Sequence, residues 1–158
     1  MARGATPAID MAERAGIDIR VHTYAHDPNA KSYGMEAAAA LGVPVGRVFK
    51  TLVAKVDGVT WVMAVVPVDA RLSLKALAAA AGGKKAEMAE PARAESLTGY
   101  VVGGISPLGL RKALLTFVDD SALAFDTVFV SAGRRGMDIE IAPGDLISLT
   151  RARTFPLT

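Results

Sequence analysis

Hydrophobic and polar residues alternate with a period of two in several short stretches of the chain, a pattern typical of half-buried β-strands. The pair Asp57-Gly58 lies between two such stretches and predicts a tight hairpin. The segment 98–110 holds four glycines and is expected to begin as a strand and continue as a shaped loop. The other strands are expected at 19–24, 48–56, 60–66, 84–88, 114–118, 127–130 and 137–141.

Helix signals alternate with these strands. Thr6 and Pro7 suit the N-cap and first turn of a helix, and Gly16 suits its C-terminal end. Helices precede, interrupt and follow the strands, and the connections mix hairpins with helical crossovers. We therefore expect a mixed α/β (α+β) fold with a mixed sheet. The expected helices cover 7–15, 32–41, 73–81, 90–97 and 146–150.

Length and composition narrow the class of protein. The chain has 158 residues, which fits one domain over residues 1–158. Hydrophobic residues make up 51% and charged residues 22%, which supports a packed core and argues against a disordered chain. The net charge of +2 is too small for binding nucleic acid through bulk charge. A charge of this size still permits local basic patches.

Cysteine is absent from the sequence. This excludes disulfides, cysteine-ligated zinc, iron–sulfur clusters and a protein thiol nucleophile. The N-terminus does not resemble a signal peptide, and no apolar run approaches the ~18 residues that would span a membrane. We expect a cytoplasmic protein that does not enter a membrane.

Familiar catalytic signatures are also absent: the chain has no nucleophile elbow, HExxH, Walker A loop or GxGxxG. His22 and His26 are four residues apart, but they straddle a strand end and a turn rather than sharing a helix face. We interpret them as a half-buried strand histidine and a turn histidine, and we expect neither a metal nor a cofactor.

Lys50 is the first candidate for chemistry. In the expected strand it shares a face with Leu52, Ala54 and Val56, while Lys55 lies on the other face. An ammonium group aligned with an apolar face must reach solvent, pair with an acid or lie over a cavity. The alternative is that the strand begins at Thr51, which would leave Lys50 in solvent.

Two glycine-rich segments are further candidates. Gly103 and Gly104 permit positive φ angles or close approach of a ligand, so backbone N–H groups there suit an oxyanion or a phosphate. Arg134 and Arg135 are flanked by glycines, and arginine on such a loop suits phosphate. The alternatives are a plain tight turn and an ordinary hairpin in which charges such as Asp138 are solvated.

Tyr24 ends an expected strand and Tyr33 opens an expected helix. A ring at either position could line the mouth of a pocket and stack on a base. The alternative for each is a partly buried tyrosine that anchors the end of an element.

Four stretches of the chain together closely resemble the YbaK-type Cys-tRNA(Pro) deacylases. These are free-standing relatives of the editing domain inserted in bacterial prolyl-tRNA synthetases. The resemblance runs from about residue 6 to residue 150. The stretches are HTYAHDPNAKSYG, VFKTLVAKVDG, KKAEMAEPARAESLTGYVVGGISPLG and VSAGRRGMDIEIAPGDL.

The resemblance implies a compact, barrel-like mixed sheet surrounded by helices. It also implies removal of a wrong amino acid from the 3′ end of an aminoacylated tRNA, without a cofactor. In this family the substrate's own cysteine thiol is thought to attack the ester, so that the products are a cysteine thiolactone and free tRNA. A partnership with prolyl-tRNA synthetase is a further expectation at the level of the family.

Residue by residue, the resemblance implies catalytic roles for Lys50, the family's essential lysine, and for Gly103. Tyr33 is a departure, because close relatives often carry phenylalanine there. Open alternatives are a deacylase for Ala-tRNA(Pro) or another small residue, and a non-catalytic module that binds tRNA or a synthetase. The residues that match substrate-pocket positions are Tyr24, Tyr33, Thr51, Ser131 and Asp138.

Overall fold

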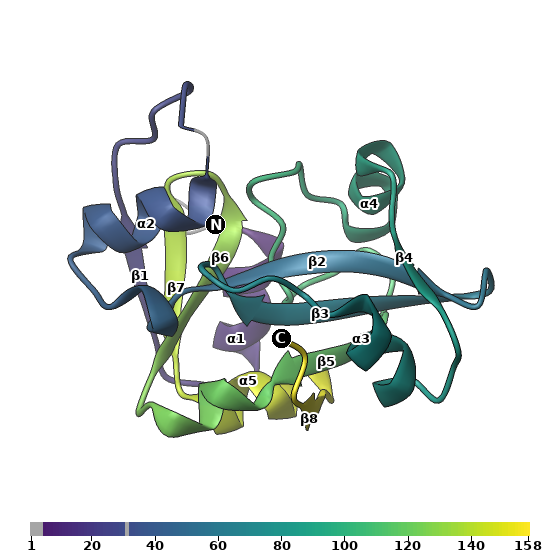
Figure 1. Ribbon diagram of the computed structural model, residues 1–158. Helices are drawn as coiled ribbons and strands as arrows, with labels where there is room; N and C mark the ends of the chain where they lie inside the picture. Colours follow the sequence, from purple (N-terminus) through teal and green to yellow (C-terminus); the bar gives the residue numbers. More distant parts are fainter. Residues whose placement is uncertain (1–4, 31) are drawn as a thin grey trace.

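Two β-sheets and the helices around them form the computed structural model, which describes residues 5–30 and 32–158 (Figure 1). The α-helices are α1 (Pro7–Arg14), α2 (Tyr33–Leu41), α3 (Leu74–Ala80), α4 (Pro91–Thr98) and α5 (Pro143–Thr150). Two short 3-10 helices cover Val45–Arg47 and Asp120–Ala124. The strands are β1 (Ile19–Thr23), β2 (Phe49–Val56), β3 (Thr60–Pro67), β4 (Ala86–Met88), β5 (Leu115–Asp119), β6 (Val128–Arg134), β7 (Met137–Ile141) and β8 (Arg153–Phe155).

The smaller sheet has the order β1-β7-β6 and is antiparallel throughout. Its register aligns His22 of β1 with Asp138 of β7, and Asp138 with Ser131 of β6. Directly opposite residues on paired strands project from the same face of a sheet. Three polar residues from three strands therefore lie side by side on one face.

The larger sheet has the order β4-β2-β3-β5-β8 and mixes both pairing directions. β2 pairs antiparallel with β3 and β4, whereas β3 with β5 and β5 with β8 are parallel pairs. The hairpin between β2 and β3 turns at Asp57-Gly58, as the sequence predicts. The expectation of a mixed α/β fold is confirmed.

The barrel-like sheet that the resemblance implies is not found, because the two sheets do not close into a barrel. A single parallel bridge, between Val48 and Phe129, links them in the part of the chain that the structure describes. The ladder does not continue past this bridge, and β6 carries a register irregularity between Ser131 and Arg134. Such a bulge bends and twists its strand locally. The sheets consequently leave a seam between β2 and β6.

The two faces of β2 pack against different helices. Ala54 and Val56 on one face join a cluster with Leu77 of α3, and Val53 on the other face packs with Ala94 of α4. This is the alternation that a strand covered on both faces requires. In Figure 1, α4 lies above the long β2–β3 hairpin and α3 lies below it.

The segment 98–110 differs from its prediction, because it begins as a loop and not as a strand. Gly99 ends α4 with φ +85°, which turns the chain out of the helix. Tyr100 is then buried, and its hydroxyl donates to the Leu108 carbonyl at 2.7 Å. This bond closes residues 101–107 into a compact loop that holds Gly103 in place.

Other expectations differ only at element ends. β6 extends to Arg134, and α5 begins at Pro143, where a proline suits the first turn of a helix. β8 was not expected, because it is three residues long and largely polar. Among the residues described, no helix has the length and apolar character needed to cross a membrane.

Candidate active site

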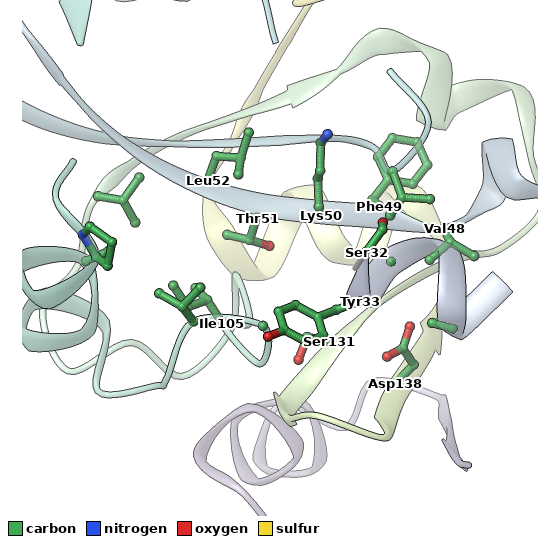
Figure 2. A pocket seen from close by; sticks show the side chains of 18 of the residues that line it. Ser32, Tyr33, Val48, Phe49, Lys50, Thr51, Leu52, Ile105, Ser131 and Asp138 are labelled. Carbon is green, nitrogen blue, oxygen red and sulfur yellow. The ribbon is translucent and has the colours of Figure 1, made fainter. Parts of the chain in front are cut away.

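A cavity of about 330 Å³ lies at the seam between the two sheets (Figure 2). Its walls come from β2, α2, α4, the loop after α4 and the strands β6 and β7. The structure brings to this one cavity all seven residues singled out by the resemblance, although lining a wall does not establish a role. They are Tyr24, Tyr33, Lys50, Thr51, Gly103, Ser131 and Asp138.

Lys50 and Thr51 leave β2 in opposite directions. Figure 2 shows Thr51 on the side that faces Ser131 and Tyr33, whereas Lys50 and Leu52 extend from the other side of the strand. The structure therefore does not place the Lys50 ammonium group among the polar residues of the cavity floor. Lys50 is nevertheless one of the residues that line the cavity.

Lys50 is partly buried, and β2 already begins at Phe49. The alternative in which the strand begins at Thr51 and Lys50 lies free in solvent is therefore wrong. Burial lowers the pKa of the Lys50 ammonium group, and the negative charge of Asp69 opposes that shift. A partly buried cation attracts an anion more strongly than one in bulk water.

The Thr51 hydroxyl is buried and has no hydrogen-bond partner, and it is the one such side-chain atom found in the residues described. The backbone of Thr51 faces the same space. Ala89 N–H donates to the Val53 carbonyl and Asp57 N–H to the Lys85 carbonyl, so odd-numbered residues of β2 direct their backbone groups toward β4. At Thr51 this edge runs beyond the end of β4. Buried polar groups ordinarily have partners, so this position is suited to a ligand.

Asp138 is 6% exposed, so the alternative in which it is a solvated hairpin charge is wrong. Its burial follows from the register that places it between His22 and Ser131. Burial raises the pKa of the Asp138 carboxyl to about 7, and the charge of His22 opposes this shift. Burial also raises the pKa of Tyr24 to about 12, with smaller contributions from the charges of Asp138 and Glu36.

Gly103 requires the absence of a side chain. Its φ is +91°, and a Cβ atom there would lie 2.5 Å from Arg135 Nε and 2.8 Å from the Tyr33 ring. The Arg135 guanidinium group stacks on that ring, with Cζ 4.4 Å from its centroid. The positive φ that the sequence allowed at Gly103 is confirmed, and the neighbours that crowd this position come from distant parts of the chain.

The two histidines pair with carboxylates. His22 Nε2 lies 2.9 Å from Glu140 Oε1, and His26 Nδ1 lies 2.8 Å from Glu36 Oε1. These contacts agree with a partly buried strand histidine and a turn histidine. Within residues 5–30 and 32–158, no group of three or more His, Asp or Glu side chains is placed to hold a metal ion.

Sequence reasoning missed the apolar end of the cavity. The alternation of β2 could have indicated Val53, but the contributions of α4 and of the residues before it depend on tertiary packing. The residues of this apolar end are Leu52, Val53, Met88, Ala89, Pro91, Ala94 and Ile105.

A family model described as an aminoacyl-tRNA editing domain matches residues 27–149. This span includes all the residues singled out above except Tyr24. The chain belongs to the aminoacyl-tRNA editing domain family. The editing domain is thus an enzyme of the aminoacyl-tRNA deacylase family, which confirms the resemblance seen in the sequence and goes against a purely non-catalytic module.

Relatives of this editing domain span almost its whole length. It is 38% identical to a protein of Enterococcus faecalis named "Putative Cys-tRNA(Pro)/Cys-tRNA(Cys) deacylase EbsC", over 97% of this chain and 93% of that one. It is 30% identical to the multifunctional Ser/Thr-tRNA deacylase ProXp-y of Escherichia coli K12, over 90% of this chain and 86% of the relative.

A solved structure described as "a putative trans-editing enzyme for prolyl tRNA synthetase" matches the fold of the editing domain with a TM-score of 0.83. The sequence identity is 25%, and the match covers 100% of this chain and 98% of the other. The layout of two sheets around the seam is therefore shared with a known editing-domain structure.

The unpaired Thr51 hydroxyl leads to a stability prediction. Thr51→Val should leave the free energy of unfolding unchanged or raise it by up to about 1 kcal/mol, because no internal hydrogen bond is lost. Thr116→Val is the matched control, since the buried Thr116 hydroxyl donates to the Leu114 carbonyl at 2.9 Å. Thr116→Val should lower the free energy of unfolding by about 1 kcal/mol. Urea unfolding of both variants would measure these free energies. Equal losses of unfolding free energy in the two variants would contradict the assignment of the Thr51 hydroxyl as unpaired.

The raised pKa of Asp138 predicts a pH dependence of stability. Between pH 3.8 and about 7 the Asp138 carboxyl of the folded protein binds a proton that the unfolded chain has released, so the contribution of Asp138 to stability falls as pH rises through this window. Asp138→Asn lacks this titration. The difference in unfolding free energy, wild type minus variant, should fall from pH 4 to 7 and stay level above that range. A difference that does not change with pH would contradict the raised pKa.

Proposed function

We propose that this editing deacylase removes cysteine from mischarged Cys-tRNA(Pro) in the cytoplasm. The observation that carries the proposal is the chemical character of the cavity. Its lining contains a buried carboxyl group, an unpaired hydroxyl and a lysine, but no histidine or cysteine to form a nucleophile–base pair. A pocket of this kind supports a reaction in which the substrate supplies the nucleophile. The 38% identity to a relative named as a Cys-tRNA deacylase supports the same choice of amino acid.

In the proposed reaction the thiol of the bound cysteine attacks the ester carbonyl carbon. The new C–S bond forms as the C–O bond to the terminal ribose breaks, and the thiol proton ends on the ribose oxygen. The products are a cysteine thiolactone and tRNA with a free 3′ end. The protein then contributes positioning and electrostatic stabilisation rather than a nucleophile.

The cavity offers one group for each part of this substrate. Lys50 suits the ribose-phosphate of the terminal adenosine, and the Gly103 backbone suits the ester carbonyl oxygen, where negative charge develops. Asp138 suits the α-ammonium group, whose charge would return the carboxyl to its ionised form. Tyr24, Tyr33, Thr51 and Ser131 complete the walls.

A second candidate substrate is tRNA charged with serine or threonine. The E. coli relative that is 30% identical is named as a Ser/Thr-tRNA deacylase, and the Thr51 hydroxyl is free to bond a hydroxyl on the substrate. A site built to bond such a hydroxyl discriminates strongly, whereas the loss of a methylene group is sensed weakly. Alanine, which has neither thiol nor hydroxyl, is the small residue least suited to this cavity.

A panel of charged tRNAs tests the proposal. Purified protein is incubated with tRNA(Pro) that carries cysteine, alanine, serine or threonine, with and without prolyl-tRNA synthetase. Cysteine should be released fastest, and for that substrate a thiolactone should appear before free cysteine. Preferred release of serine or threonine would favour the second candidate, and no release above the buffer rate would reject the function.

Lys50→Ala is the matching variant, with Lys55→Ala as its control. Both lysines lie on β2, but Lys55 lies over the Trp61 ring, 4.9 Å from its centroid, and does not line the cavity. Lys50→Ala should abolish turnover and still fold, because its ammonium group forms none of the ion pairs found in the residues described. Near-normal turnover by Lys50→Ala would reject the role of this lysine.

A further inference from the structure

Arg135 joins three segments that carry cavity residues. From the turn between β6 and β7, its guanidinium group donates twice to the Val102 carbonyl, from Nε at 3.0 Å and from a terminal nitrogen at 2.6 Å. The same group stacks on Tyr33 at the start of α2. Val102, Gly103 and Tyr33 line the cavity, whereas Arg135 does not. The arginine therefore holds the wall from behind.

The contact with the Val102 carbonyl sets the direction of the next amide. The described residues contain no cis peptide bond, so the Gly103 N–H points opposite to the Val102 C=O. Because that carbonyl is turned toward Arg135, outside the cavity lining, the Gly103 N–H is turned away from Arg135. The neighbouring Gly104 N–H donates to the Val101 carbonyl at 2.9 Å, but the hydrogen bonds of the described residues include none from the Gly103 N–H.

We propose that Arg135 is a positioning residue for the deacylation reaction: it fixes and polarises the Val102–Gly103 peptide so that the Gly103 N–H stabilises the developing oxyanion. This inference rests on the proposed function. A cationic donor on a carbonyl withdraws electron density from the peptide, which strengthens its N–H as a donor. A preorganised donor aimed at developing charge is among the largest contributions an active site makes.

Packing around Gly103 supports the same role. A Cβ atom on Gly104 would lie 2.9 Å from Arg134 Cα, so the loop fits closely against the β6–β7 turn. The sequence had suggested that Arg134 and Arg135 could together bind phosphate. In the structure, however, Nε and one terminal nitrogen of Arg135 donate to a carbonyl and the guanidinium lies over a ring, so a phosphate could bind only through the remaining N–H groups.

The variants Arg135→Met and Arg135→Lys test the proposal, with Arg134→Met as the matched control. Both arginines are exposed neighbours in one turn, and Arg134 donates none of the side-chain hydrogen bonds to the loop. Deleting an oxyanion donor outright lowers kcat by about 10²–10³, so an indirect effect should be smaller. Arg135→Met should lower kcat on Cys-tRNA(Pro) roughly tenfold to a hundredfold and change KM less than about threefold. Arg135→Lys should recover part of the loss, and Arg134→Met should match the wild type.

A second measurement needs no turnover. In 15N-labelled protein, Arg135→Met should shift the Gly103 amide signal upfield and speed hydrogen exchange in residues 101–104, whereas Arg134→Met should do neither. An unmoved Gly103 signal would overturn the inference even if the proposed substrate proved wrong. So would a rise in KM with kcat unchanged, which indicates a phosphate contact instead. If Arg135→Met does not fold, the same measurements on Arg135→Lys decide the question, because that variant keeps the charge.

Discussion

The incomplete pairing between β2 and β6 is the constraint on which the site depends. The two sheets share one bridge, at Val48 and Phe129, and beyond it no ladder joins them in the part of the chain described. A fully paired sheet would use the backbone groups of Thr51 in hydrogen bonds and fill the space with side chains. The open seam instead leaves a cavity walled by rigid strands. Sites built on such elements hold their geometry more accurately than sites built on loops alone.

The seam also explains why the cavity has two chemically different ends. Toward the smaller sheet, the register places His22, Asp138 and Ser131 side by side, and burial raises the pKa of the Asp138 carboxyl to about 7. Toward α4 the lining is almost entirely apolar. An aminoacyl ester has a matching division, with a charged amine and a polar ester near the amino acid and a flat heteroaromatic base beyond the ribose. The match supports the family's chemistry on physical grounds that are independent of sequence similarity.

Local patterns in the sequence predicted most elements, because each depends on its own residues. The period of two in β2, the Asp57-Gly58 turn and the Thr6 cap of α1 are features of this kind. The barrel-like sheet was not found, because closure depends on whether β2 and β6 continue to pair. No short stretch of sequence determines whether two distant strands pair. β8 was not predicted, because three largely polar residues are too few to show the alternation of a strand.

The candidate site was predictable in part. Lys50, as a cation aligned with apolar positions, and Gly103, as a point of close approach, both stood out from their neighbours. The burial of Asp138 did not, because it arises from a register across three strands. Nor did the role of Arg135, whose partners lie about 30 and 100 residues away along the chain. Both features depend on contacts between residues far apart in the sequence. Local sequence patterns do not determine such contacts.

The most direct measurement is a crystal structure with a non-hydrolysable analogue, in which an amide replaces the ester between cysteine and the 3′ position of adenosine. We expect the cysteinyl group to lie in the seam, with its amine near Asp138 and its carbonyl oxygen facing the Gly103 N–H. We also expect the 5′ side of the adenosine to lie near Lys50. An analogue bound away from the seam, or bound with its cysteinyl group in solvent, would contradict the account.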